Sequence, residues 1–171
     1  MSSQTQITGP TIVVLMGVAG SGKTTIGQKL AAELGWPFRD ADEFHPAANI
    51  AKMAAGIPLE DEDRRPWLDA LRSYIRRMVA SGQGAVVTCS ALRERYRAVL
   101  TDGLSAVRLV HLAGDFNLIL ARLGARSGHF MKPEMLESQF ATLESPQNAL
   151  TIDVAQSPDA IVAEIRTSLS L

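Results

Sequence analysis

The chain has 171 residues, a length that predicts one domain with room for a substantial core. With 46% hydrophobic residues, 20% charged residues and a net charge of −1, it is a typical globular protein with no electrostatic reason to bind nucleic acid or an anionic membrane. Its one cysteine excludes an intrachain disulfide, and no apolar run approaches the roughly 18 residues of a membrane-spanning helix. The N-terminus lacks the pattern of a secretory signal, so we expect a cytoplasmic protein.

Apolar segments alternate with helical patterns along the chain. Strands are expected at 37–40, 85–89, 107–112 and 150–154, and at 11–16 after a flexible tail formed by residues 1–10. Such alternation favours a parallel sheet with helices on both faces. No linker or internal repeat divides residues 11–171, which we therefore expect to form a single domain.

The strand at 11–16 leads into the spacing G-x-x-x-x-G-K-T, followed by a helical pattern. The predicted nucleotide-binding residues are Gly17, Val18, Ala19, Gly20, Ser21, Gly22, Lys23, Thr24 and Thr25. Glycines let the backbone turn its N–H groups toward phosphate oxygens, and the following helix adds its positive end. Lys23 would reach the β- and γ-phosphates, and the Thr24 hydroxyl would ligate Mg²⁺. The alternative is a chance glycine-rich turn, which the strand before it and the helix after it disfavour.

Asp40 and Asp42 follow the short strand at 37–40. Separated by one residue, they face the same way, at the strand end where open α/β sheets bind ligands. We expect one carboxylate associated with magnesium, Asp40, and one, Asp42, that orients or deprotonates a substrate. The alternative is that Asp42 only caps the next helix.

His45, Asn49 and Lys52 follow the two aspartates and suggest a polar wall for a substrate, although each residue alone is more often structural or solvated. The acidic run 60–63 then predicts the start of a helix, with Asp61 or Asp63 as its N-cap.

The strand at 85–89 ends at Cys89 and Ser90 and carries no acidic residue where many nucleotide hydrolases place one. The Asp40 and Asp42 pair is the natural substitute for holding metal-bound water. Cys89 is expected to be a buried, inert thiol. Arg97, on the next helix, could reach a ligand, with a solvated position as the alternative.

Residues 122–139 combine basic side chains with little core pattern, and Gly128 and Pro133 bracket their centre. This composition suggests a mobile lid that carries Arg122 or Arg126 to the phosphates, excluding water and neutralising charge. A solvated basic loop is the alternative. Residues 144–149 are expected to touch the adenine, an expectation that rests only on their position in the sequence.

These motifs resemble the gluconokinase family over nearly the whole chain from residue 11. The resemblance rests on the phosphate-binding loop, Asp40-Ala41-Asp42, His45-Pro46, Asn49, Lys52-Met53, Gly56, Pro58-Leu59, Asp61, Asp63-Arg64, Pro66-Trp67-Leu68, Cys89-Ser90-Ala91-Leu92, Tyr96-Arg97, Gly114-Asp115-Phe116 and Arg126-x-Gly128-His129-Phe130. It implies a three-layer α/β/α P-loop kinase fold, like that of nucleoside monophosphate and shikimate kinases, with a parallel five-stranded sheet.

The resemblance also implies ATP- and Mg²⁺-dependent phosphorylation of D-gluconate at its 6-hydroxyl, commonly by a homodimer. In-line transfer would depend on Lys23, Asp42 and Arg126, with Thr24 and Asp40 at the metal. The residues expected to hold the acidic polyol are Asp40, Asp42, His45, Lys52, Arg64, Ser90, Arg97 and His129. Two alternatives stay open, another small-molecule kinase such as shikimate kinase and a non-enzymatic ATP-sensing module.

Overall fold

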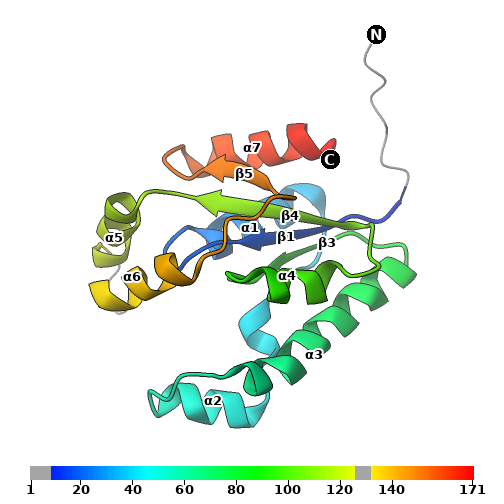
Figure 1. Cartoon of the computed structure of the whole chain (residues 1–171). Helices are drawn as coiled ribbons and strands as arrows, with labels where there is room; N and C mark the ends of the chain where they lie inside the picture. Colours follow the sequence, from blue (N-terminus) through cyan, green and yellow to red (C-terminus); the bar gives the residue numbers. More distant parts are fainter. Residues whose placement is uncertain (1–8, 126–131) are drawn as a thin grey trace.

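The computed structural model describes residues 9–125 and 132–171 (Figure 1). Within these residues, five strands form one parallel sheet in the order β2-β3-β1-β4-β5, which confirms the predicted α/β class. The strands are β1 (Ile12–Met16), β2 (Phe38–Asp40), β3 (Ala85–Thr88), β4 (Val107–Ala113) and β5 (Leu150–Asp153). The helices are α1 (Lys23–Leu34), α2 (Ala47–Ala54), α3 (Asp61–Ala80), α4 (Glu94–Thr101), α5 (Phe116–Gly124), α6 (Pro133–Thr142) and α7 (Pro158–Leu169), with a 3-10 helix, η1 (Ala41–Phe44).

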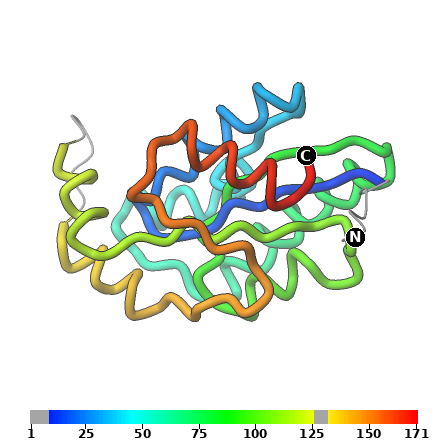
Figure 2. Tube along the Cα trace, turned by 90° about the horizontal axis from the view of Figure 1, so that it is seen from above, coloured from blue at the N-terminus to red at the C-terminus, as the bar shows by residue number. Residues whose placement is uncertain are grey.

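The sheet separates two apolar cores because successive side chains of a strand point to opposite faces. In β1 every residue is buried: Ile12, Val14 and Met16 pack on the side of α3, whereas Val13 and Leu15 pack on the side of α1 and α7. Figures 1 and 2 show the resulting layers, with α1 and α7 together over one face and α3 and α4 over the other. This is the three-layer arrangement expected from the sequence.

A third, smaller cluster lies beyond the carboxyl end of β4, where α5 and α6 pack against each other (Figure 1). Its buried side chains include Ile119 and Leu123 of α5 and Leu136 of α6, and they contact Val18 of the phosphate-binding loop. The helices that flank residues 126–131 are thereby packed onto the loop itself. None of the helices in the described ranges combines the length and apolar character needed to cross a bilayer.

The start of α3 differs from the prediction by one residue. Glu60 is the N-cap and Asp61 the first helical residue, so the expectation of Asp61 or Asp63 as the cap is wrong. Asp63 acts from inside the first turn, where its Oδ2 accepts the Glu60 N–H at 2.9 Å. A carboxylate at the third helical position can satisfy the N-cap amide in this way, so the acidic run still stabilises the helix start.

Candidate active site

The loop between β1 and α1 has the backbone that the glycine spacing predicts. Gly17, Gly20 and Gly22 have φ angles of 148°, 79° and 94°, values that favour glycine. A Cβ on Gly20 would lie 2.6 Å from Cγ of Leu123, so α5 leaves no room for a side chain there. Gly22 directly precedes α1, whose first turn contains no acidic residue. The loop and the positive end of α1 therefore present a site for an anion.

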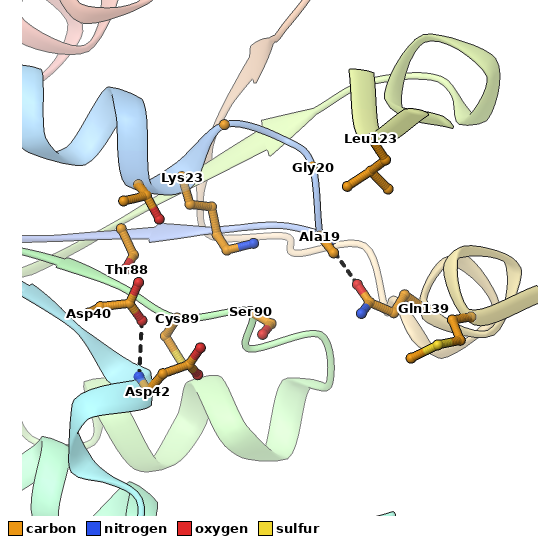
Figure 3. Close-up of a pocket in the computed structure, with 13 residues that line it drawn as sticks. Ala19, Gly20, Lys23, Asp40, Asp42, Thr88, Cys89, Ser90, Leu123 and Gln139 are labelled. Atoms are coloured by element: carbon orange, nitrogen blue, oxygen red, sulfur yellow. Dashed lines mark hydrogen bonds between the residues drawn. The ribbon is translucent and has the colours of Figure 1, made fainter. Parts of the chain in front are cut away.

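Lys23 lies inside this loop, as the motif requires. Its Nζ donates to the carbonyl oxygens of Gly17 at 2.9 Å and Val18 at 3.0 Å. Figure 3 shows the ammonium group at the edge of a cavity, between the loop and the predicted carboxylates. A cation held here can meet a phosphate that the loop amides bind.

The cavity beside Lys23 has a volume of about 540 Å³ and opens at the carboxyl edge of the sheet (Figure 3). This is within the usual range for small-molecule sites. The loop and Thr24 form one wall, Asp40 and Asp42 another, and Met135 and Gln139 the end next to α6. The structure thus brings the predicted phosphate site and the predicted carboxylate pair into one space.

Asp40 and Asp42 have different environments. Asp40 Oδ1 accepts the N–H of Asp42 at 3.0 Å and caps η1. Because Pro46 precedes α2, Asp42 caps neither helix, and the alternative of a purely capping role for it is wrong. The Asp42 side chain is 86% exposed toward the open cavity. Partial desolvation by the cavity walls, followed by repulsion from Asp40, raises the pKa of Asp42, against the opposing effects of His45 and Lys23.

Thr24, Asp40 and Thr88 could share a metal ion with bound phosphates. Asp40 is paired in register with Thr88, whose buried Oγ1 has no hydrogen-bond partner within the described residues. In those same residues no group of three or more His, Cys, Asp or Glu could ligate an ion by itself. The oxygen atoms of Thr24, Asp40 and Thr88 suit a hard ion that also binds phosphates and water, as Mg²⁺ does.

A second cavity, of about 580 Å³, adjoins the first and shares Ser90 and Gln139 with it. Its polar lining includes Arg64 of α3 and, from the start of α4, Arg93, Arg95 and Tyr96. The lining also includes two acidic residues, Glu60 and Asp61. Asp61 is bound by Arg95 at 2.7 Å and accepts the Tyr96 hydroxyl at 2.7 Å.

The Tyr96 hydrogen bond lowers the pKa of Asp61, desolvation opposes this change, and the hydrogen bond and charge of Arg95 lower the pKa further. Arg64 lies 5.6 Å from the centre of the Tyr96 ring and 4.0 Å from Asp61, on the same wall. The arginines on this wall suit an anionic ligand, and the hydroxyl groups of Ser90 and Tyr96 suit a hydroxylated one.

Arg97 lies outside both cavities, which corrects the expectation that it binds the ligand. Its side chain is 1% exposed, so the solvated alternative is wrong as well. The guanidinium donates to the carbonyl oxygens of Ala91 at 2.9 Å, Leu92 at 3.1 Å and Glu144 at 2.8 Å. Ala91 has a φ of 43°, a conformation unfavourable for a residue with a side chain. Arg97 therefore holds a strained loop in the position that places Ser90 between the cavities.

Among the described residues, neither His45 nor Lys52 lines either of these two cavities. The His45 ring is 5% exposed and lies behind Asp42, with Nε2 3.9 Å from Asp42 Oδ1. Lys52 Nζ donates to the two carboxylate oxygens of Asp63 at 2.7 and 2.8 Å. Of the predicted polar wall, Asp42 therefore lines the cavity, His45 lies next to it, and Lys52 binds Asp63 instead.

Of the predicted lid residues, Arg122 lies in the described part of the structure. Arg122 Nη2 donates to the carbonyl oxygen of Val154 at 2.6 Å, so this guanidinium joins α5 to the end of β5. Arg126 and His129 lie outside the described residues, and their roles stay predictions. Burial raises the pKa of Cys89 to about 12, consistent with the inert thiol expected there.

Gln139, like Thr88, is a site residue that sequence reasoning missed. Its Oε1 accepts the backbone N–H of Ala19 at 2.7 Å, and its side chain lines both cavities (Figure 3). It is one polar residue in an ordinary helical pattern, 120 positions from its partner, and no local signal marks it.

Comparison with known proteins agrees with this geometry. The sequence model of the shikimate kinase family matches residues 19–169. The thermoresistant gluconokinase of Escherichia coli (strain K12) is 43% identical, over 89% of each chain. The crystal structure of a gluconokinase from Sinorhizobium meliloti 1021 superposes with a TM-score of 0.83 at 40% identity, covering 94% of this chain and 92% of that one.

A shikimate kinase structure from Aquifex aeolicus has a TM-score of 0.60 at 18% identity, covering 93% of this chain and 96% of that chain. At that identity the likeness shows the fold alone. The sequence is therefore much closer to the gluconokinases than to this shikimate kinase, although all share one architecture.

We expect Arg97→Lys to destabilise the protein by about 3 kcal/mol, because one ammonium cannot satisfy carbonyl groups on two segments and leaves them buried. Denaturant unfolding measures the change. Arg108→Lys is the matched control, since Arg108 donates to the carbonyl of Val107 near the surface. Equal, small decreases in the free energy of unfolding of the two variants would contradict the assigned role of Arg97.

Proposed function

Because the chain belongs to the gluconokinase family, within the shikimate kinase-like P-loop proteins, we propose that it transfers the γ-phosphoryl group of ATP to the 6-hydroxyl of D-gluconate. The observation that carries the proposal is the junction of the two cavities at Ser90 and Gln139. A phosphate-binding loop lies on one side of this junction and an arginine-rich cavity on the other. A phosphoryl donor and an anionic acceptor can thus meet beside Asp42.

On the donor side, the loop amides and Lys23 bind the triphosphate. When Mg²⁺ is bound it neutralises phosphate charge, and we propose that Thr24 holds it directly and Asp40 through water. Since the Arg122 guanidinium already donates to Val154, Arg126 is our candidate for the lid arginine. In this proposal residues 122–139 form the lid and His129 contacts the acceptor.

On the acceptor side, Asp42 faces the reacting hydroxyl and accepts or orients its proton. Arg64 binds the carboxylate at the other end of the acceptor, where the planar guanidinium matches two oxygens. Transfer through a loose transition state depends mostly on such positioning and charge neutralisation.

We further propose that the protein is a homodimer, as the resemblance to the family implies, and that it is cytoplasmic. Sedimentation equilibrium of the full chain measures the oligomeric state, and cell fractionation measures the location. A monomer at micromolar concentration would contradict the dimer.

The decisive experiment is a panel of acceptors assayed by coupled ADP release. We expect D-gluconate to be phosphorylated far faster than shikimate or nucleoside monophosphates. Preferred turnover of shikimate would assign the other kinase reaction. ATP binding without any acceptor-dependent ADP release would instead support the ATP-sensing alternative.

Lys23→Ala should lower kcat by about 100-fold or more, because it removes a charge placed at the transferred phosphoryl group. Steady-state kinetics with saturating gluconate and ATP measure this loss. Lys29→Ala is the control, since Lys29 lies on α1 and pairs with Asp159 at 2.6 Å, outside both cavities. A near wild-type kcat for Lys23→Ala would reject the assigned role of this lysine.

Asp42→Asn should lower kcat by about 100-fold while ATP binding changes little, because the amide cannot accept the hydroxyl proton. Calorimetric titration with ATP and steady-state kinetics separate the two effects. Asp69→Asn, on the exposed side of α3, should change neither. Equal losses in ATP affinity and kcat would contradict a role for Asp42 at the acceptor.

Arg64→Lys should raise the KM for gluconate by about tenfold with a smaller change in KM for ATP, because the ammonium cannot form the bidentate contact. The exposed neighbouring residue offers the control Arg65→Lys. An unchanged KM for gluconate would remove Arg64 from the acceptor site.

A further inference from the structure

Asn49 and His45 form a buried hydrogen-bonded pair next to Asp42, and binding of either substrate does not explain this pair. Asn49 of α2 is 2% exposed. Its Nδ2 donates to the backbone carbonyl of Asp63 at 2.7 Å and lies 3.2 Å from His45 Nδ1. His45 in turn places Nε2 3.9 Å from Asp42 Oδ1.

These contacts determine the orientation of the Asn49 amide. The backbone oxygen of Asp63 can only accept, so the amide group at 2.7 Å from it is the NH₂ group. That nitrogen carries a second hydrogen, which is available to His45 Nδ1. His45 Nδ1 then accepts, and the ring proton of the neutral imidazole resides on Nε2, the nitrogen that faces Asp42.

The ring that carries this proton is held rigidly. His45 stacks on Trp67 with ring centres 4.5 Å apart and planes 13° apart. The Trp67 indole N–H donates to the carbonyl oxygen of Ala41 at 2.7 Å, directly before Asp42 in the chain. Burial lowers the pKa of His45, Asp42 raises it and Arg64 lowers it, a balance that favours a neutral ring.

An ion pair fixes Asp63, whose backbone carbonyl binds Asn49. The Asp63 carboxylate accepts from Lys52 Nζ at 2.7 and 2.8 Å and from the Glu60 N–H at 2.9 Å. These bonds hold the first turn of α3, whose carbonyl receives the Asn49 amide. The connection therefore runs from the start of α3 through α2 to the carboxylate on the cavity wall.

We propose that Asn49 is a positioning residue that holds His45 in the Nε2–H tautomer, so that the imidazole N–H is directed at Asp42. At 3.9 Å this N–H attracts Asp42 Oδ1 electrostatically without forming a hydrogen bond, which biases that oxygen toward His45 and leaves the other for the acceptor hydroxyl. The inference rests on the proposed function in that Asp42 is taken to face that hydroxyl. The tautomer itself does not depend on which substrate is turned over.

Nitrogen-15 NMR of the labelled full chain tests the tautomer directly, with His45→Gln identifying the His45 signals among the three histidines. We expect the wild-type ring to carry its proton on Nε2. In Asn49→Asp the carboxylate can only accept, so the proton should move to Nδ1 or a cation should form. Asn117→Asp, on the exposed side of α5, makes the same chemical change away from the site and should leave the His45 signals unchanged.

Kinetics supply the second readout. Asn49→Asp should lower kcat for gluconate by roughly 10- to 100-fold with little change in KM for ATP. In a His45→Gln background, Asn49→Leu should add little further loss, since there is no imidazole left to orient.

A wild-type ring protonated on Nδ1 would overturn the proposal, and this measurement requires no Asn49 variant to fold. An unchanged tautomer in folded Asn49→Asp would overturn it too. An Nε2–H tautomer in a protein that does not phosphorylate gluconate would instead reject the proposed function and leave the assignment of the tautomer intact.

Discussion

The register of the parallel sheet places the chemical groups of the site next to one another. Leu15 of β1 pairs with Thr88 of β3, and Thr88 pairs with Asp40 of β2, so three strands end level with one another. Beyond these ends lie the phosphate-binding loop, the Ser90 loop and the carboxylate pair. A slip of one residue would turn a strand's side chains to the opposite face, so the two buried cores that exclude such a slip also set the spacing of the site.

Sequence patterns predicted best the parts of the site that depend on local backbone. The loop glycines and the Asp40 and Asp42 pair follow from short-range spacing and from their position after strands, and the structure places them in one cavity. The roles of the charged residues were harder to predict from the sequence. Arg97 binds carbonyl groups of two distant segments, and a carbonyl has no signature because every residue carries one. Lys52 and Asp63 are 11 residues apart and meet only after α2 and α3 have packed.

The arginines of this chain divide by what satisfies their donors. Arg97 and Arg122 donate to backbone oxygens, which hold loops and strand ends in place. Arg64 instead faces a cavity, and within the described part of the chain its guanidinium makes only long contacts with Asp61 and Tyr96. An arginine whose donors are all bound within the protein stabilises the fold. An arginine with long contacts can exchange them for a ligand carboxylate at little cost in free energy. This distinction becomes visible only once the partners are known.

The bond between Ala19 and Gln139 also bears on how the protein is made. It closes a chain loop of 120 residues and joins the first strand-helix turn to a helix in the last third of the sequence. During synthesis, the N-terminal segment leaves the ribosome long before the wall that completes its cavity. Contacts so far apart in sequence form late and slowly. The nascent chain can thus form the glycine loop early, but it cannot enclose a nucleotide until α6 has emerged and docked.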